Sequence, residues 1–201
     1  MDVNRITKLR FIEEFRRQRI VLFSINDTKK IFSLENNNTT KHLLIRLRKD
    51  RIVERLARDK YQFLLTENPP HEFTVANFLV APSYISLESA LSYYGIIDQF
   101  PYRITSITIS KQRTLMIKNK QYSYSSIKKG KFKDYIKIDD FLIASKEKAI
   151  FDYVYFAFNG LRTLNTLLDI KNHLHNKPIF DYFIKNGDDH LIKFIKKNVK
   201  L

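Results

Sequence analysis

The chain has 201 residues and a formal net charge of +15 at pH 7, from 36 Lys and Arg against 21 Asp and Glu. This length suffices for one or two domains with a hydrophobic core. The absence of Cys excludes disulfides, thiolate metal sites and a thiol nucleophile. The four Gly are too far apart for a Walker A loop, a GxGxxG turn or a GxSxG elbow. No apolar run approaches the roughly 18 residues of a membrane span, so we expect a cytoplasmic protein with no membrane partner.

Positive charge is densest in the N-terminal third. Residues 1–66 hold 16 basic and 8 acidic residues, a net charge of +8, whereas residues 67–201 hold 20 and 13, a net charge of +7 over about twice the length. Ten of the 13 Arg lie before residue 66, a split that codon bias toward Lys does not explain. Because guanidinium groups match phosphate oxygens and guanine edges better than ammonium groups do, this split indicates a nucleic-acid partner.

The N-terminal third has the pattern of a helical domain that ends in a hairpin. Apolar spacing and turn residues predict, in chain order, helices over residues 6–15, about 27–32 and about 39–50, then strands over 52–56 and 61–64. Residues 22–25 form a short apolar segment. We expect Asn26 or Asp27 to cap the second helix, and Thr39 or Thr40 to begin the third.

Three helices and a two-stranded hairpin make a winged helix-turn-helix, whose third helix enters the major groove of double-stranded DNA. Asn37 and Asn38 suit phosphate or adenine, and Thr39 suits a thymine methyl. The predicted DNA-binding residues lie just before the third helix, along it and on the wing: Asn37, Asn38, Thr39, Lys41, His42, Arg46, Arg55, Arg58 and Lys60. Residues 44–56 resemble the junction of recognition helix and wing in many bacterial and archaeal regulators. Those usually have Gly where Arg51 stands, so either Asp50 takes the left-handed position or the helix ends differently.

Pro69 and Pro70 mark a linker over residues 67–71, which separates a domain over 1–66 from one over 72–201. In the second domain, residues 75–81 suit a helix or a strand, and Ser86 is expected to cap a helix that Gly95 closes. Strands are predicted over residues 102–110, 114–117, 121–125, 135–138 and 141–144. A helix follows over about 145–158, which Ser145 is expected to cap and Gly160 to end. Further helices are predicted over about 161–175, 178–186 and 188–199. The fold class is therefore α+β, a winged helix-turn-helix followed by a mixed α+β domain that ends in helices.

Two blocks of the second domain resemble a known family. Residues 84–97 (YISLESALSYYGII) and 101–108 (PYRITSIT) look like the central block of AbiEi-type antitoxins, which belong to abortive-infection, type IV toxin–antitoxin systems. Residues 121–124 (QYSY) and 144–152 (ASKEKAIFD) are similar to that family's later block. The resemblance covers about residues 20–158 and fades in the last 40. It implies an antitoxin that binds repeats in its own promoter, represses its operon and opposes a nucleotidyltransferase-like toxin; it does not imply a stable complex with that toxin.

Other side chains suggest chemistry less clearly. Asp134, Asp139, Asp140, Glu147 and Lys148 echo the acidic residues and Lys of metal-dependent nucleases, but Glu147 and Lys148 are adjacent instead of spaced as Glu-x-Lys. His173 and His175 would face opposite sides of a helix, which is poor metal geometry. We therefore expect no catalytic residue, no metal and no cofactor.

The positions of Asp152 and of four tyrosines can also be predicted, and two alternative functions remain. Asp152 is expected on a helix surface. The tyrosines at 84, 93, 94 and 102 are expected mostly in the core, with a binding face as the alternative. A metal-dependent nucleic-acid-processing enzyme and a winged-helix protein-interaction module are the alternatives to the antitoxin.

Overall fold

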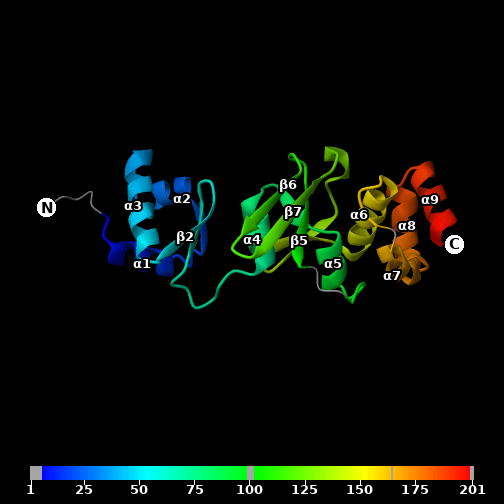
Figure 1. Ribbon diagram of the computed structural model, residues 1–201, viewed down its shortest axis with the longest axis horizontal. Coiled ribbons are helices and arrows are strands. Elements are labelled where there is room, and N and C mark those ends of the chain that lie inside the picture. Colours follow the sequence, from blue (N-terminus) through cyan, green and yellow to red (C-terminus); the bar gives the residue numbers. More distant parts are fainter. Residues whose placement is uncertain (1–5, 99–101, 164, 200–201) are drawn as a thin grey trace. The chain divides into compact units, whose positions relative to one another are not determined.

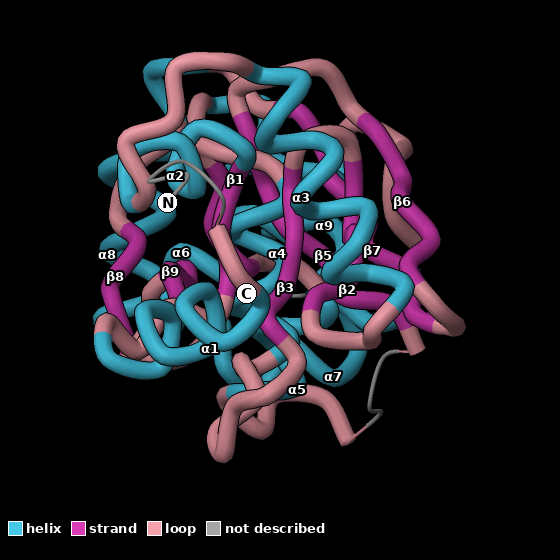
Figure 2. The backbone as a smooth tube through the Cα atoms, turned by 90° about the vertical axis from the view of Figure 1, so that its left-hand side faces the viewer, coloured by secondary structure: helices cyan, strands magenta, loops and turns pink. Residues whose placement is uncertain are grey.

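The computed structural model describes residues 6–98, 102–163 and 165–199. The chain divides into two compact units, Met1–His71 and Glu72–Leu201. Each unit contains both helices and strands (Figures 1 and 2), so the prediction of a mixed α+β chain is confirmed. Pro101, which belongs to one of the resembling blocks, lies outside the described residues.

The first unit packs three helices against a small sheet. Its elements are α1 (Lys8–Arg17), β1 (Leu22–Ser24), α2 (Ile25–Ile31), α3 (Asn37–Lys49), β2 (Val53–Ala57) and β3 (Lys60–Phe63). The strands form an antiparallel sheet in the order β1-β3-β2, so the short apolar segment at 22–25 supplies a strand. Phe11, Phe15 and Phe23 are fully buried, and the rings of Phe11 and Phe15 stack with centroids 4.0 Å apart. This aromatic core fixes α1 against the sheet.

Helix α2 begins two residues earlier than a cap at Asn26 would allow. The Ser24 hydroxyl accepts a hydrogen bond from the backbone N–H of Asp27 at 3.2 Å, and the Asp27 carboxylate accepts one from the Ser24 N–H at 2.7 Å. This reciprocal capping box satisfies two N–H groups that a helix start leaves unpaired. Ser24 is therefore the cap, and the predicted caps at Asn26 or Asp27 were wrong.

Helix α3 also begins earlier than predicted. The Asn36 side chain accepts a hydrogen bond from the N–H of Asn38 at 2.8 Å, so the helix starts at Asn37 and not at Thr39 or Thr40. The predicted start at Thr39 or Thr40 was therefore wrong, because Asn is also among the best N-cap residues.

The end of α3 shows what replaces the usual Gly. Arg51 itself takes the left-handed conformation, with φ of 54°. Its N–H donates to the carbonyl of Arg48 at 3.0 Å, and the N–H of Ile52 donates to that of Leu47 at 2.9 Å. This pair of bonds is a Schellman motif, the helix end that Gly usually forms. Here Arg51 forms it, at the energetic cost of a side chain in the left-handed conformation.

The second unit is built on a six-stranded mixed sheet. Its elements are α4 (Glu72–Leu79), β4 (Ser83–Ile85), α5 (Glu88–Tyr93), β5 (Arg103–Thr108), β6 (Arg113–Ile117), β7 (Lys120–Ser126), the 3₁₀ helix η1 (Lys129–Lys131), β8 (Tyr135–Ile138), β9 (Phe141–Ala144), α6 (Lys146–Phe158), α7 (Asn165–Leu174), α8 (Lys177–Asn186) and α9 (Asp189–Val199). The strand order is β6-β7-β5-β4-β9-β8, with β4–β9 and β5–β7 parallel and the other neighbours antiparallel. The segment at 75–81, left open between helix and strand, belongs mainly to α4.

Helices cover both faces of this sheet (Figure 1). Tyr124 on β7 donates its hydroxyl hydrogen to the carbonyl of Ala76 in α4 at 2.7 Å, which ties one face to that helix. Helices α5 and α6 lie on the other face. Helices α8 and α9 pack against α6, and α7 packs against α8 and α9. The Ser145 hydroxyl accepts from the N–H of Lys148 at 3.2 Å and caps α6, as predicted. Gly95 and Gly160 follow α5 and α6 with positive φ, as their predicted terminating roles require.

The start of α5 differs from prediction. Leu87 is the cap residue and makes no side-chain cap bond, so the prediction of a Ser86 cap was wrong. Leu87 has φ of 59° and ψ of −139°, a conformation that side chains disfavour, and it is fully buried. The Ser86 hydroxyl is instead committed to a buried carboxylate described below.

Candidate nucleic-acid interface

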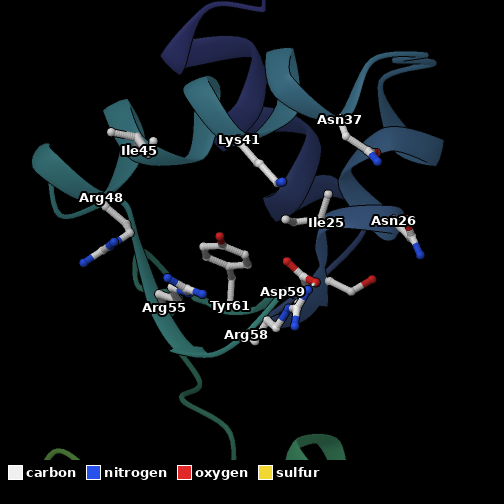
Figure 3. A pocket seen from close by; sticks show the side chains of 11 residues that line it. Ile25, Asn26, Asn37, Lys41, Ile45, Arg48, Arg55, Arg58, Asp59 and Tyr61 are labelled. Carbon is white, nitrogen blue, oxygen red and sulfur yellow. Dashed lines mark ion pairs between the residues drawn. The ribbon is translucent and has the colours of Figure 1, made fainter.

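A basic groove lies in the first unit between α3, the β2–β3 hairpin and the start of α2 (Figure 3). Its volume is about 660 Å³. Helix α3 contributes Asn37, Lys41, Ile45 and Arg48, the hairpin contributes Arg55, Arg58, Asp59 and Tyr61, and the start of α2 contributes Ser24, Ile25 and Asn26. Four cations therefore face one carboxylate, and a concave surface of one sign attracts anions over a distance.

The α3 side of the groove follows from helical spacing. Asn37, Lys41 and Arg48 are 4 and 7 residues apart, and at about 100° per residue they fall within about 40° of one another around the helix. Leu44 and Leu47 lie on the adjoining side of α3 and are buried in the core. In Figure 3 the Lys41 and Arg48 side chains extend from α3 toward the hairpin. Neither has a hydrogen-bond or ion-pair partner within the described part of the chain.

The hairpin positions two further cations. The strand pairing shifts register between Arg55 and Ala57, and the Arg55 Nε donates to the Ala57 carbonyl at 3.2 Å. Arg58 lies at the turn, where its Nε is 3.8 Å from the carboxylate of Asp59, and both side chains are exposed. An exposed pair at this distance contributes little energy, so Arg58 is available to an anionic ligand.

The groove also has an apolar component. Tyr61 and Ile25 are buried in its floor, at 7% and 6% exposure, whereas Ile45 on α3 is 49% exposed. Ile45 lies four residues after Lys41 and three before Arg48, so an exposed apolar side chain stands within a row of cations.

Only some of the predicted DNA-binding residues meet in this groove. Asn37, Lys41, Arg55 and Arg58 line it, whereas Asn38, Thr39 and His42 are exposed on α3 without lining it. Lys60 begins β3 and is half-buried. Arg46 lies about 180° around the helix from Asn37 and lines a separate cavity of about 190 Å³ with residues of α1 and its cap. Arg48 and Asn26 line the groove but were not predicted to bind DNA, although the helical spacing from Lys41 indicates Arg48.

A buried polar centre lies in the second unit, where the sequence predicted a surface acid. Asp152 is fully buried, so that expectation was wrong. Its carboxylate is 2.5 Å from the ammonium of Lys148, itself only 1% exposed, and accepts hydrogen bonds from Ser86 at 2.9 Å and Tyr84 at 3.0 Å. Burial raises the pKa of Asp152 above its ordinary value, and the charge of Lys148 opposes that rise. The i, i+4 spacing of Lys148 and Asp152 was the missed signal.

The block that carries the family resemblance is mostly internal. The Glu88 carboxylate lies 3.0 Å from the Arg162 guanidinium and 3.6 Å from that of Arg103. The hydroxyl of Ser89 accepts from the N–H of Thr105 at 2.8 Å, and the hydroxyl of Thr105 accepts from the N–H of Ser89 at 2.9 Å. These polar residues fix α5 to the sheet. The residues that carry the family resemblance therefore stabilise the fold of the second unit.

The four tyrosines do not form one face. Tyr84 is fully buried, and burial raises the pKa of its hydroxyl. Tyr94 is half-buried and donates to the carbonyl of Ala144 at 2.8 Å. Tyr93 and Tyr102 are exposed, at 45% and 74%.

The nuclease-like acids do not assemble either. Asp134, Asp139 and Asp140 are exposed on the segments around β8, whereas Lys148 is buried against Asp152. Across residues 6–98, 102–163 and 165–199, no three His, Asp or Glu side chains gather as metal ligands. In the same ranges no helix has the length and apolarity to cross a bilayer.

Comparison with protein-family models and with curated protein sequences found no match to this chain.

Proposed function

We propose that the first unit is a winged helix-turn-helix domain that binds double-stranded DNA, with α3 in the major groove and the β2–β3 hairpin as the wing. The element order α1-β1-α2-α3-β2-β3, with a sheet that joins β1 to the hairpin, supports this assignment. The observation that carries the proposal is the groove of four cations and one carboxylate between α3 and the hairpin. The cations of such a groove neutralise backbone phosphates, while the adjacent helix enters the major groove of double-stranded DNA.

Within this proposal the groove residues divide into two roles. Lys41, Arg48 and Arg58 neutralise backbone phosphates, since their charges have no strong partner in the fold. Asn37 and Ile45 face base edges, where an amide suits adenine and an exposed apolar side chain suits the methyl group of thymine. The interface thereby combines affinity from phosphates with a preference for A·T pairs.

A protein-interaction role for the same fold predicts a different surface. Protein interfaces are depleted of charge at their centre, whereas this groove places Lys41 and Arg48 on either side of Ile45. The composition of the groove therefore favours DNA over a protein partner.

We extend the proposal to an antitoxin that represses its own operon and opposes a nucleotidyltransferase-like toxin. This part rests on the sequence resemblance of residues 84–97, 101–108, 121–124 and 144–152. The polar residues of those blocks support the fold of the second unit, through the pair Lys148 and Asp152 and the pair Ser89 and Thr105.

The experiment measures fluorescence anisotropy of the full chain with the duplex upstream of its own gene and with a scrambled duplex of equal composition, each at two salt concentrations. We expect tighter binding to the native duplex at both. Equal binding to both duplexes that disappears at the higher salt would refute a sequence-reading regulator. Toxicity of the neighbouring gene product with and without this chain tests the antitoxin part separately.

A further inference from the structure

A small cavity in the second unit is lined by lysines. It has a volume of about 170 Å³ and lies among the loop that carries η1, helix α6 and helix α8. Lys131, Lys133, Lys148 and Lys185 all line it, together with Tyr182. No carboxylate of the described residues belongs to its lining.

Most of this positive charge is not neutralised. Lys148 is paired with Asp152 behind the cavity. Among the described residues, the Lys131 ammonium donates a hydrogen bond to one neutral group, the carbonyl of Asn186 at 3.3 Å. Lys133 and Lys185 are exposed and have no ion-pair partner among the described residues. The nearby Asp134 carboxylate is bound by the hydroxyl of Tyr182 at 2.5 Å.

Two of the lysines are held in place before any ligand arrives. The Lys148 ammonium donates to the Lys131 carbonyl at 2.9 Å and to the Asp152 carboxylate at 2.5 Å, which uses two of its three N–H groups. The Lys131 ammonium lies 5.5 Å from the ring centroid of Phe151 and 5.2 Å from that of Tyr155. These contacts restrict both side chains, which lowers the entropy lost on binding.

We propose that this cavity binds the phosphate group of a small ligand, with Lys131, Lys133 and Lys185 around the anion and Lys148 at the back. Lysine binds phosphate as a point charge, and a concave site of one sign concentrates the field. The cavity volume of about 170 Å³ is many times the space that one buried water needs, so the cavity admits a phosphate group. The ligand is inorganic phosphate or a phosphomonoester whose organic part lies at the cavity mouth. This inference is independent of DNA binding by the first unit.

The test is a titration of the isotope-labelled full chain, followed by backbone amide NMR, at constant ionic strength set with potassium chloride. One arm uses inorganic phosphate, and a second arm uses a nucleoside 5′-monophosphate. We expect saturable shifts at residues 129–133 and 182–186 in at least one arm. The arm that saturates at lower concentration identifies the source of the phosphate group.

Charge-matched variants separate this site from general attraction. Lys133→Ala with Lys185→Ala removes two lysines of the cavity, and Lys137→Ala with Lys193→Ala removes two exposed lysines outside its lining. The first pair should raise the dissociation constant at least tenfold, and the second should change it less than twofold. Absence of saturable shifts in both arms, or equal weakening by the two pairs, would overturn the proposal.

Discussion

The buried ion pair between Lys148 and Asp152 leads to a quantitative prediction about the second unit. Asp152→Ala removes the acceptor of three hydrogen bonds and leaves the Lys148 ammonium, 1% exposed, with only the Lys131 carbonyl. Removing one partner of a buried pair costs about 3–5 kcal/mol of unfolding free energy. The hydrogen bonds from Ser86 and Tyr84 to a charged acceptor give a similar sum, about 3–6 kcal/mol at 1.5–3 kcal/mol each. Against a usual total of about 5–15 kcal/mol, the loss is large.

A second variant separates the charge from the hydrogen bonds. Lys148→Met with Asp152→Asn removes both charges, while the amide oxygen of Asn still accepts from Ser86 and Tyr84. Because a neutral replacement of a buried pair is often nearly free, we expect this double variant to lose less than about 2 kcal/mol.

The assay is urea unfolding followed by far-UV circular dichroism, since the chain contains no Trp. Amide hydrogen exchange in β4 and α6 assigns the loss to the second unit. A loss below about 1 kcal/mol in Asp152→Ala would refute the reasoning, as would a double variant as unstable as the sum of its two single changes.

Three further predictions concern the first unit. Replacing the contacted thymine of the tightest-binding duplex by deoxyuridine should lower the affinity of the parent protein about fourfold, because one buried methyl group is lost. The affinity of Ile45→Ala should not change. Equal losses of affinity in both proteins would show that Ile45 does not contact the base. Arg51→Gly should raise the unfolding free energy by about 0.5–1 kcal/mol, because Gly adopts positive φ without strain; a thermal shift downward contradicts this. Ser24→Ala should lower it by about 1 kcal/mol through loss of the α2 cap, and an unchanged urea midpoint would count against that role.

The sequence predicted the elements well where local chemistry decides them. Strands β8 and β9 and the cap of α6 at Ser145 match, because alternation and capping are local signals. The caps at Ser24 and Asn36 were missed because several capping residues stand in a row and only backbone geometry selects one. Ser86 was assigned to a cap because nothing local reveals that its hydroxyl bonds to Asp152, 66 residues away.

The candidate groove was predicted in part for the same reason. Lys41, Arg55 and Arg58 follow from the charge pattern and the hairpin, whereas the choice between Arg46 and Arg48 depends on which side of α3 meets the hairpin. That side is fixed by the burial of Leu44 and Leu47 against the aromatic core. Helical spacing shows that Arg46 and Arg48 point to different sides of α3, and tertiary packing decides which of them faces the hairpin.

The most direct measurement compares Arg48→Ala with Arg46→Ala in the salt dependence of binding to the native upstream duplex. Both changes remove one exposed Arg from α3, but only Arg48 lines the groove. If the groove is the DNA interface, Arg48→Ala should reduce the slope of log K against log salt by about 0.9, the value of one phosphate contact. Arg46→Ala should leave the slope unchanged. A reduced slope for Arg46→Ala alone, or equal reductions for both, would contradict the account.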